Sequence, residues 1–245
     1  MSAITNGISQ SQINIYRNCP YAYYLSYIKG YEPMGFDPTV MEVGRRVHDA
    51  IDIYYRNLFL ANGKEDEIFN NVYSILRESW DHMLDVEYLK KAYICLKNFA
   101  KLEAEETKKK DYIKPLSELD LRHERFRGKI DRFDLVKMIA GDFKTNTNAV
   151  VSYDYKMQAA IYSYLIEKEF GQKIKYFVFY FLYPNETRII KTDNLKKILD
   201  NAKQYRNSIT QSFEDNKFER KPRTKSTCKY CDYKFYCRRL NNVFI

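Results

Sequence analysis

The sequence predicts an α/β or α+β protein in which a mixed sheet is flanked by helices and preceded by a mainly helical segment. Two observations carry this prediction. Apolar residues recur at helical spacing through the first 110 residues, and the central third of the chain then alternates apolar and polar residues as strands do. The elements follow in the order helices, adjacent strands, helix, strand pair and helix.

The first long helix is predicted from apolar residues at helical spacing: Val43, Val47, Ile51, Tyr54 and Leu58. Residues 59–63, which include Asn62-Gly63, end this pattern. Helical spacing then resumes in a second apolar series: Ile68, Val72, Ile75, Leu76, Tyr93, Leu96 and Phe99. We therefore expect helices through most of the first 110 residues.

Strands are predicted from alternating or apolar runs over residues 128–136, 138–144, 174–182 and 187–191. A helix with one apolar face is predicted over residues 153–170, between the second and third strands. Asp193 is a candidate cap for a last helix that runs to about Gln211.

The chain of 245 residues is long enough to bury one large core, and no repeat or long linker divides it. We expect a single domain with a mainly helical segment over 1–112, a core over 113–212 and a cysteine-rich segment over 213–245. Neither a run of 18 apolar residues nor a secretory signal occurs. We therefore expect a cytoplasmic protein that does not span a membrane.

The chain carries a net charge of +9 and contains 23 tyrosines. A basic, tyrosine-rich chain is compatible with a polyanionic partner such as nucleic acid, because bases stack on aromatic rings and phosphates attract Lys and Arg. A solvated basic surface would give the same composition, so these numbers permit nucleic-acid binding without requiring it.

Four of the five cysteines are divided one against three. Cys19 lies near the start, and the others form Cys228-x2-Cys231-x5-Cys237 near the end. Zinc sites usually take two close pairs of ligands, whereas a four-thiolate iron–sulfur cluster suits one local triplet and a distant fourth cysteine. Four thiolates bind either metal, so zinc remains an alternative. Cys95 is expected to be an ordinary buried thiol.

Asp131, Asp142 and Lys144 lie on the predicted central strands. Asp142 and Lys144 are two residues apart, so on a strand both point to the same face. Two carboxylates beside a lysine can hold Mg²⁺ or Mn²⁺ and act on a metal-bound water, which suits attack on a phosphodiester. The alternative is a solvent-facing pair of charges, with Asp131 paired to Arg132 or Lys129.

The ordered set Gly44-x3-His48, Gly128-x-Ile-Asp131, Asp142-x-Lys144 and Gln158-x3-Tyr162 resembles the RecB-type branch of the PD-(D/E)XK nucleases. With the cysteines, the chain resembles the iron–sulfur nucleases of that branch over residues 9–240. These include the CRISPR-associated exonucleases of the fourth Cas family and the nuclease domain of AddB-type helicase–nuclease subunits. The resemblance implies a restriction-endonuclease-like core and termini joined by a cluster.

The resemblance also implies roles for individual residues. The catalytic metal would be held by His48, Asp131 and Asp142, with the Phe143 carbonyl as a further ligand. Lys144 would act on the attacking water, and Gln158 and Tyr162 would position Lys144 or the DNA backbone. A [4Fe–4S] cluster would be held by Cys19, Cys228, Cys231 and Cys237. Many relatives have Glu where this chain has Asp142, a mild departure.

Each of these residues also has a plainer interpretation. His48 could be a hydrogen-bonded core histidine, Gln158 a solvated helix residue and Tyr162 simple packing. Glu118 and Glu124 are further acids before the core, and the sequence does not choose between them.

The resulting prediction is a Mg²⁺- or Mn²⁺-dependent deoxyribonuclease, an exonuclease on single-stranded DNA or strand ends. CRISPR integrase or helicase partners and a homo-oligomer are compatible with it. Two alternatives stay open: a catalytically silent DNA-binding adaptor held together by zinc or an iron–sulfur site, and an endonuclease that trims DNA ends within a complex.

Overall fold

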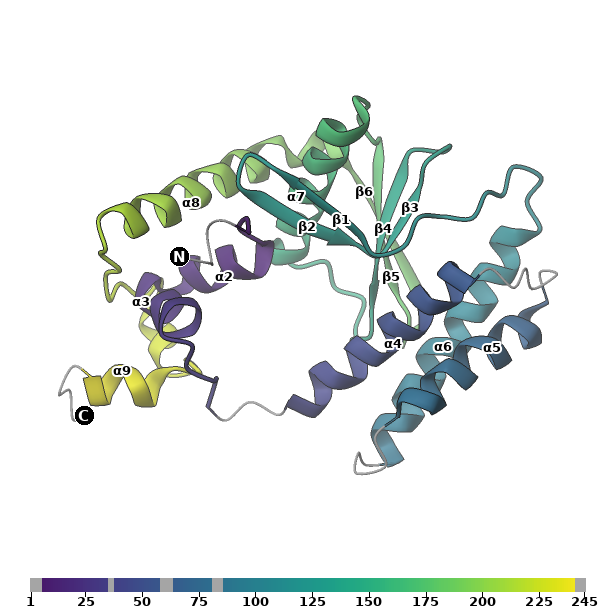
Figure 1. Ribbon diagram of the computed structural model, residues 1–245, viewed down its shortest axis with the longest axis horizontal. Coiled ribbons are helices and arrows are strands. Elements are labelled where there is room, and N and C mark those ends of the chain that lie inside the picture. Colours follow the sequence, from purple (N-terminus) through teal and green to yellow (C-terminus); the bar gives the residue numbers. More distant parts are fainter. Residues whose placement is uncertain (1–5, 35–37, 58–63, 81–85, 241–245) are drawn as a thin grey trace.

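The computed structural model describes residues 6–34, 38–57, 64–80 and 86–240. A central sheet lies between two groups of helices (Figure 1). The helices on one side are α4 (Pro38–Asn57), α5 (Glu65–Ser79) and α6 (Val86–Thr107). The helices on the other side are α7 (Tyr153–Phe170) and α8 (Lys196–Glu214). None of the described helices is long and apolar enough to cross a membrane.

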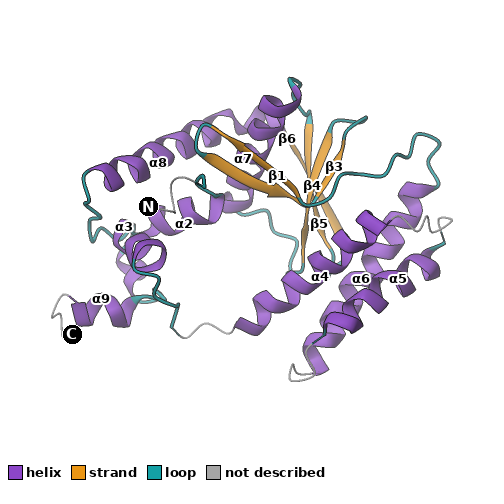
Figure 2. Cartoon of the chain, viewed as in Figure 1, coloured by secondary structure: helices purple, strands orange, loops and turns teal. Residues whose placement is uncertain are grey.

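The sheet has four strands in the order β3-β4-β5-β6. The strands are β3 (Arg132–Asp134), β4 (Ile139–Lys144), β5 (Tyr176–Phe181) and β6 (Glu186–Lys191). β4 and β5 run parallel and the other pairs run antiparallel, so the sheet is mixed, as predicted. A second sheet is the antiparallel hairpin of β1 (Leu119–His123) and β2 (Phe126–Ile130), drawn beside the larger sheet in Figure 2.

The structure divides the strand that we predicted over residues 128–136. Its first half pairs with β1 as β2, and its second half pairs with β4 as β3, so the chain passes from one sheet to the other at Asp131. At this junction the Asp131 side chain accepts a hydrogen bond from the main-chain N–H of Phe143 (2.7 Å). The change of sheet therefore fixes a carboxylate beside β4.

The two faces of the sheet pack against different helices. Phe177, Phe179 and Phe181 alternate along β5 and contact the α7–α8 side, whereas Phe143 and Tyr180 contact the α4–α6 side. This alternation follows from the two-residue period of a strand. Asp142 and Lys144, on either side of Phe143, consequently face α7.

The helix predicted over residues 153–170 is α7. The Ser152 side chain caps its start by accepting from the N–H of Tyr155, and Gly171 ends it with a φ of 70°. The predicted cap of the last helix is wrong. Asp193 lies within a 3-10 turn, and α8 begins only after Leu195, without a side-chain cap. The predicted end of the first long helix, at 59–63, lies outside the described residues.

Segments from the two ends of the sequence lie side by side (Figure 1). They are α2 (Gln10–Asn18), α3 (Pro20–Tyr23) and a π-helical turn (Tyr24–Ile28) from the start, and α9 (Lys234–Leu240) from the end. The N–H of Met34 donates to the carbonyl of Asp232 (2.9 Å), and the Tyr233 hydroxyl donates to Ser26 Oγ (2.8 Å). These contacts hold the cysteine-rich segment against the first helices.

Candidate active site

The Asp142 and Lys144 side chains meet at the end of β4. Asp142 is 2% exposed, and its Oδ2 lies 2.7 Å from the Lys144 ammonium nitrogen. The alternative of a solvent-facing pair of charges is therefore excluded for Asp142 and Lys144, because the Asp142 carboxylate is buried. Asp142 Oδ2 makes no hydrogen bond of good geometry among the described residues. The Lys144 ammonium neutralises the charge of the Asp142 carboxylate. A metal cation in the same position would neutralise it equally well.

Gln158 on α7 connects the same two side chains. Its amide nitrogen donates to Asp142 Oδ1 (2.6 Å), and its amide oxygen accepts from Lys144 Nζ (3.0 Å). The plainer interpretation of Gln158 as a solvated residue is excluded, because its exposure is 9%. Tyr155, one turn earlier on α7, lies with its ring centroid 4.5 Å from Lys144 Nζ. Gln158 and Tyr155, on the first turns of α7, thus fix the direction in which the Lys144 ammonium points.

His48 on α4 approaches Asp131 from the other side of the site. Nδ1 of His48 lies 3.3 Å from Asp131 Oδ2. Gly44, one helical turn before His48, faces Thr145, and a Cβ there would meet Thr145 Oγ1 at 3.4 Å, an ordinary contact. His48 is therefore paired with the predicted carboxylate and is not a core histidine bonded elsewhere.

Glu118 joins this pair. Ligand atoms of His48, Glu118 and Asp131 all lie within 4.8 Å of one another, which makes them a possible metal site. The Glu118 side chain is 10% exposed and forms an ion pair with Lys129. Glu124, the other acid that the sequence offered, instead lies 3.3 Å from Arg206. The structure thus chooses between the two acids.

These groups line an open cleft of about 580 Å³, which we call the active-site cleft. Its lining residues are Met41, Gly44, Arg45, His48, Asp49, Glu118, Lys129, Asp131, Lys144 and Thr145. Asp142 and Gln158 lie behind Lys144 and do not line the cleft. The carboxylate of Asp142 therefore reaches the cleft only past the ammonium of Lys144.

Phe143 is buried and Tyr162 is half-buried next to the site. The Tyr162 ring packs on Gly128, where a Cβ would lie only 2.6 Å from the ring. This contact explains why a glycine precedes Ile130-Asp131 and how α7 comes close to β2. The main chain of Phe143 lies beside Asp131, to which its N–H donates.

The charges of the site control its protonation. Burial alone would lower the pKa of His48, but the Asp131 carboxylate outweighs it and raises this pKa to about 9. Burial, together with the charge of Asp131, raises the pKa of Asp142 to about 6. Burial works against the charge of Lys144, but Asp142 and Asp131 outweigh it and raise the lysine pKa. At neutral pH His48 and Lys144 are therefore cations beside two carboxylates.

The four predicted ligand cysteines line one cavity of about 320 Å³: Cys19, Cys228, Cys231 and Cys237. Cys95 lies elsewhere, fully buried among α4–α6, as expected. No disulfide bond joins any of these five described cysteines. Burial raises the pKa of the Cys231 and Cys237 thiols, and Arg220 and Arg238 offset this only in part at Cys237, so deprotonation of these thiols needs further positive charge. A metal centre would supply that charge.

A comparison with known protein families decides the identity of the chain. The model of the PD-(D/E)XK nuclease superfamily matches residues 7–238. The chain belongs to the PD-(D/E)XK nuclease superfamily. Membership indicates a metal-dependent nuclease, which hydrolyses phosphodiester bonds. A search of curated proteins gives no match.

Two residues of this superfamily member's site were missed by sequence reasoning. Glu118 could not be separated from Glu124, because it precedes β1 in an irregular segment with a φ of 48° and belongs to no periodic pattern. Tyr155 lies three residues before Gln158, and only its position in the first turn of a helix facing Lys144 signals its role.

Proposed function

We propose that this PD-(D/E)XK protein is a Mg²⁺- or Mn²⁺-dependent exonuclease that acts on single-stranded DNA or DNA ends. One observation carries the proposal. A lysine is held between Asp142 (2.7 Å) and Gln158 (3.0 Å) at the wall of a cleft that also contains the His48–Asp131 pair. An ammonium fixed next to several possible metal ligands suits phosphodiester hydrolysis.

The donor set fits a hard divalent cation. Carboxylate oxygens and one imidazole suit Mn²⁺ and Mg²⁺, and the Lys144 ammonium 2.7 Å from Asp142 Oδ2 shows that this buried oxygen accepts a neighbouring positive charge. We propose His48, Asp131 and Asp142 as ligands, with the Phe143 carbonyl and with Glu118 in addition. When bound, the cation lowers the pKa of water and neutralises charge on the phosphate.

The protein's own groups have separate tasks in this proposal. Lys144 remains an ammonium at neutral pH, so it orients the attacking water and stabilises charge on the phosphate rather than removing a proton. Gln158 and Tyr155 hold the lysine in place. Tyr162 supports Gln158 and β2 from behind. His48 gives up its proton when it becomes a ligand.

We further propose a structural [4Fe–4S] cluster on Cys19, Cys228, Cys231 and Cys237. Two observations favour it over zinc. A tetrahedral zinc site brings its sulfurs to roughly 3.8 Å from one another, whereas no three cysteine sulfurs in the described part of the chain lie within 4.8 Å of one another. The cavity between them, about 320 Å³, is also larger than a single ion needs. The cluster would join the two ends of a single nuclease domain.

The biological setting belongs to the same proposal. A CRISPR or phage DNA-processing role, with an integrase or helicase partner and a homo-oligomeric form, follows from the resemblance to CRISPR-associated and AddB-type nucleases. A soluble cytoplasmic enzyme would fit it.

The proposal is tested with anaerobically purified protein and end-labelled single-stranded DNA in Mn²⁺. The parent should shorten the DNA stepwise from one end. Asp142→Ala should abolish this, whereas Asp193→Ala, an exposed acid on the 3-10 turn, should not. Internal cuts would show that the protein is an end-trimming endonuclease and not an exonuclease. If both proteins bound the DNA and left it intact, the proposed nuclease activity would be wrong, and the hypothesis of a DNA-binding adaptor would remain.

A further inference from the structure

The positive charge of the chain is concentrated in one short region. Nine of the 23 residues from 217 to 239 are Lys or Arg and two are acidic, a net charge of +7 out of +9 for the whole chain. The remaining 222 residues are therefore close to neutral. We call residues 217–239 the basic segment. Such a charge imbalance is typical of a surface that meets a polyanion.

The basic side chains of this segment are mostly exposed, and four of them (Arg220, Lys229, Lys234 and Arg238) also line the cysteine cavity. Eight of the nine basic residues are exposed, and Lys234 is half-buried. Among the described residues, the one ion pair of the segment joins Lys217 to Glu219 (3.4 Å). Charges that are neither paired nor buried keep the full attraction for a phosphate chain.

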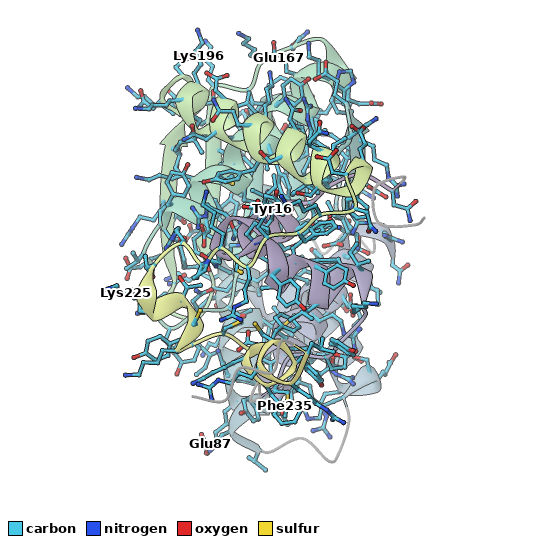
Figure 3. The ribbon with its side chains drawn as sticks, turned by 90° about the vertical axis from the view of Figure 1, so that its left-hand side faces the viewer. Tyr16, Glu87, Glu167, Lys196, Lys225 and Phe235 are labelled. Atoms are coloured by element: carbon cyan, nitrogen blue, oxygen red, sulfur yellow. The ribbon has the colours of Figure 1, made fainter. Side chains whose placement is uncertain are left out.

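Two large aromatic side chains stand among these charges. Tyr230 is 75% exposed and Phe235 is 51% exposed, although both belong to residue types that normally pack inside. The ammonium of Lys229 lies 5.4 Å from the ring centroid of Tyr230. Figure 3 shows this side of the molecule, with Lys225 and Phe235 on the yellow C-terminal ribbon in the foreground.

The segment is held as a fixed surface rather than a loose tail. The N–H of Arg223 donates to the carbonyl of Asn18 (2.9 Å), and the N–H of Tyr21 donates to the carbonyl of Glu219 (3.1 Å). Tyr236 stacks on Tyr31 at 4.4 Å between ring centroids. A surface that is already ordered loses less entropy when it binds a ligand.

From this charge and these rings we propose that the basic segment is a second DNA-binding surface, which holds a single strand away from the active-site cleft. The phosphates would lie along the Lys and Arg side chains, and unpaired bases would stack on Tyr230 and Phe235. A duplex is disfavoured, because its bases are already stacked on one another. The choice of DNA as the polyanion rests on the proposed function.

The test measures binding without cleavage. Asp142→Ala protein in EDTA is titrated into a labelled single-stranded oligonucleotide, and fluorescence anisotropy is followed from about 50 to 300 mM salt. Replacing both Lys221 and Lys225 with Glu should weaken binding at least about tenfold and flatten the salt slope by about 0.7 for each phosphate that the variant no longer neutralises. The matched control replaces Lys196 and Lys197 on α8 with Glu and should retain affinity and slope; Lys196 lies at the other end of the view in Figure 3.

The aromatic rings are tested separately. Tyr230→Leu should weaken binding about 5- to 150-fold, the range for removal of one stacked base, while Tyr230→Phe should keep the parent's affinity. Metal content and circular dichroism identify a variant that does not fold, in which case Phe235→Leu replaces it.

Equal affinities for parent, charge variant and Tyr230→Leu would overturn the inference even if the enzyme cleaves DNA. Charge-dependent binding to anionic vesicles in place of the oligonucleotide would overturn it as well. Loss of binding in these variants would sustain it even if the parent never cleaves, so its failure and that of the proposed nuclease are distinguishable.

Discussion

Arg132 donates a hydrogen bond to Glu103 Oε2 at 2.5 Å, and the Glu103 side chain is completely buried. The hydroxyls of Tyr55 (2.8 Å) and Tyr112 (2.5 Å) also donate to this carboxylate. Arg132 directly follows Asp131, and Tyr55 lies two helical turns after His48 on α4. The buried ion pair therefore ties the helical layer to the strand at the place where His48 meets Asp131.

Replacing Arg132 with Met should lower the free energy of unfolding by about 3–5 kcal/mol, because the Glu103 carboxylate would stay buried without its counter-charge. Denaturant unfolding measures the change. Arg56→Met provides the comparison, since it breaks an exposed ion pair with Asp52 and should lower stability by less than about 1 kcal/mol. Equal losses of stability in the two variants would show that the Glu103–Arg132 pair has no special weight.

Gly128→Ala should destabilise the protein by about 1–3 kcal/mol, the usual effect of overpacking, since the new methyl group would lie 2.6 Å from the Tyr162 ring. Gly44→Ala should be neutral or stabilising by up to about 1 kcal/mol, because its methyl group meets only Thr145 Oγ1 at 3.4 Å and alanine favours helices. Thermal melting of both variants checks the contrast. A Gly128→Ala protein as stable as its parent would mean that Tyr162 moves freely.

Mn²⁺ affinity should rise with pH. His48, whose pKa is about 9 in the metal-free protein, holds its proton more tightly than usual and must release it to become a ligand. The logarithm of the affinity should therefore rise with a slope near one between about pH 6.5 and 8.5. Below about pH 6 Asp142 is protonated as well, and the slope should steepen.

Calorimetric titrations across this pH range measure the slope. In His48→Asn the rise above about pH 6.5 should disappear, and only the rise below about pH 6, where Asp142 is protonated, should remain with a slope near one. An affinity in the parent that does not change between pH 6.5 and 8.5 would exclude His48 as a ligand.

Cys231→Ser should remove iron and acid-labile sulfide from anaerobically purified protein and lower its melting temperature, because the cysteine cavity would then offer three thiolates in place of four. Cys95→Ser should keep the full iron content, since that thiol is buried among α4–α6. Elemental analysis also separates the alternatives. Zinc in place of iron would replace the proposed cluster with a four-thiolate zinc site.

Local patterns predicted much of the fold. The helix at 153–170 has a serine cap and a terminal glycine, and the apolar runs at 138–144 and 174–182 mark the strands that pair as β4 and β5. The division of one predicted strand at Asp131 was missed, because pairing with two different sheets is a tertiary choice with no local signal. Asp193 has a side chain that can cap a helix, yet it lies inside a 3-10 turn that precedes α8.

The candidate site was likewise predictable only in part. The shared direction of Asp142 and Lys144 and the helical spacing of Gln158 were predictable from backbone periodicity, and the structure brings these three together. Glu118 was not predictable from periodicity, because its position depends on the path by which an irregular segment brings it close to His48. Only the folded chain shows which of two nearby acids reaches the cleft.

The shared cysteine cavity also sets an order of events in the cell. Cys19 is made first, but 208 residues separate it from Cys228, and the ribosome supplies those residues in sequence. Until then Ala22 and Leu25, which pack with Cys19 and Tyr233, lack their apolar cover. Contacts between such distant residues form late and slowly. A nascent chain therefore carries an unprotected thiol and an apolar patch until residues 228–237 have been made, which makes it a natural client for chaperones during that interval.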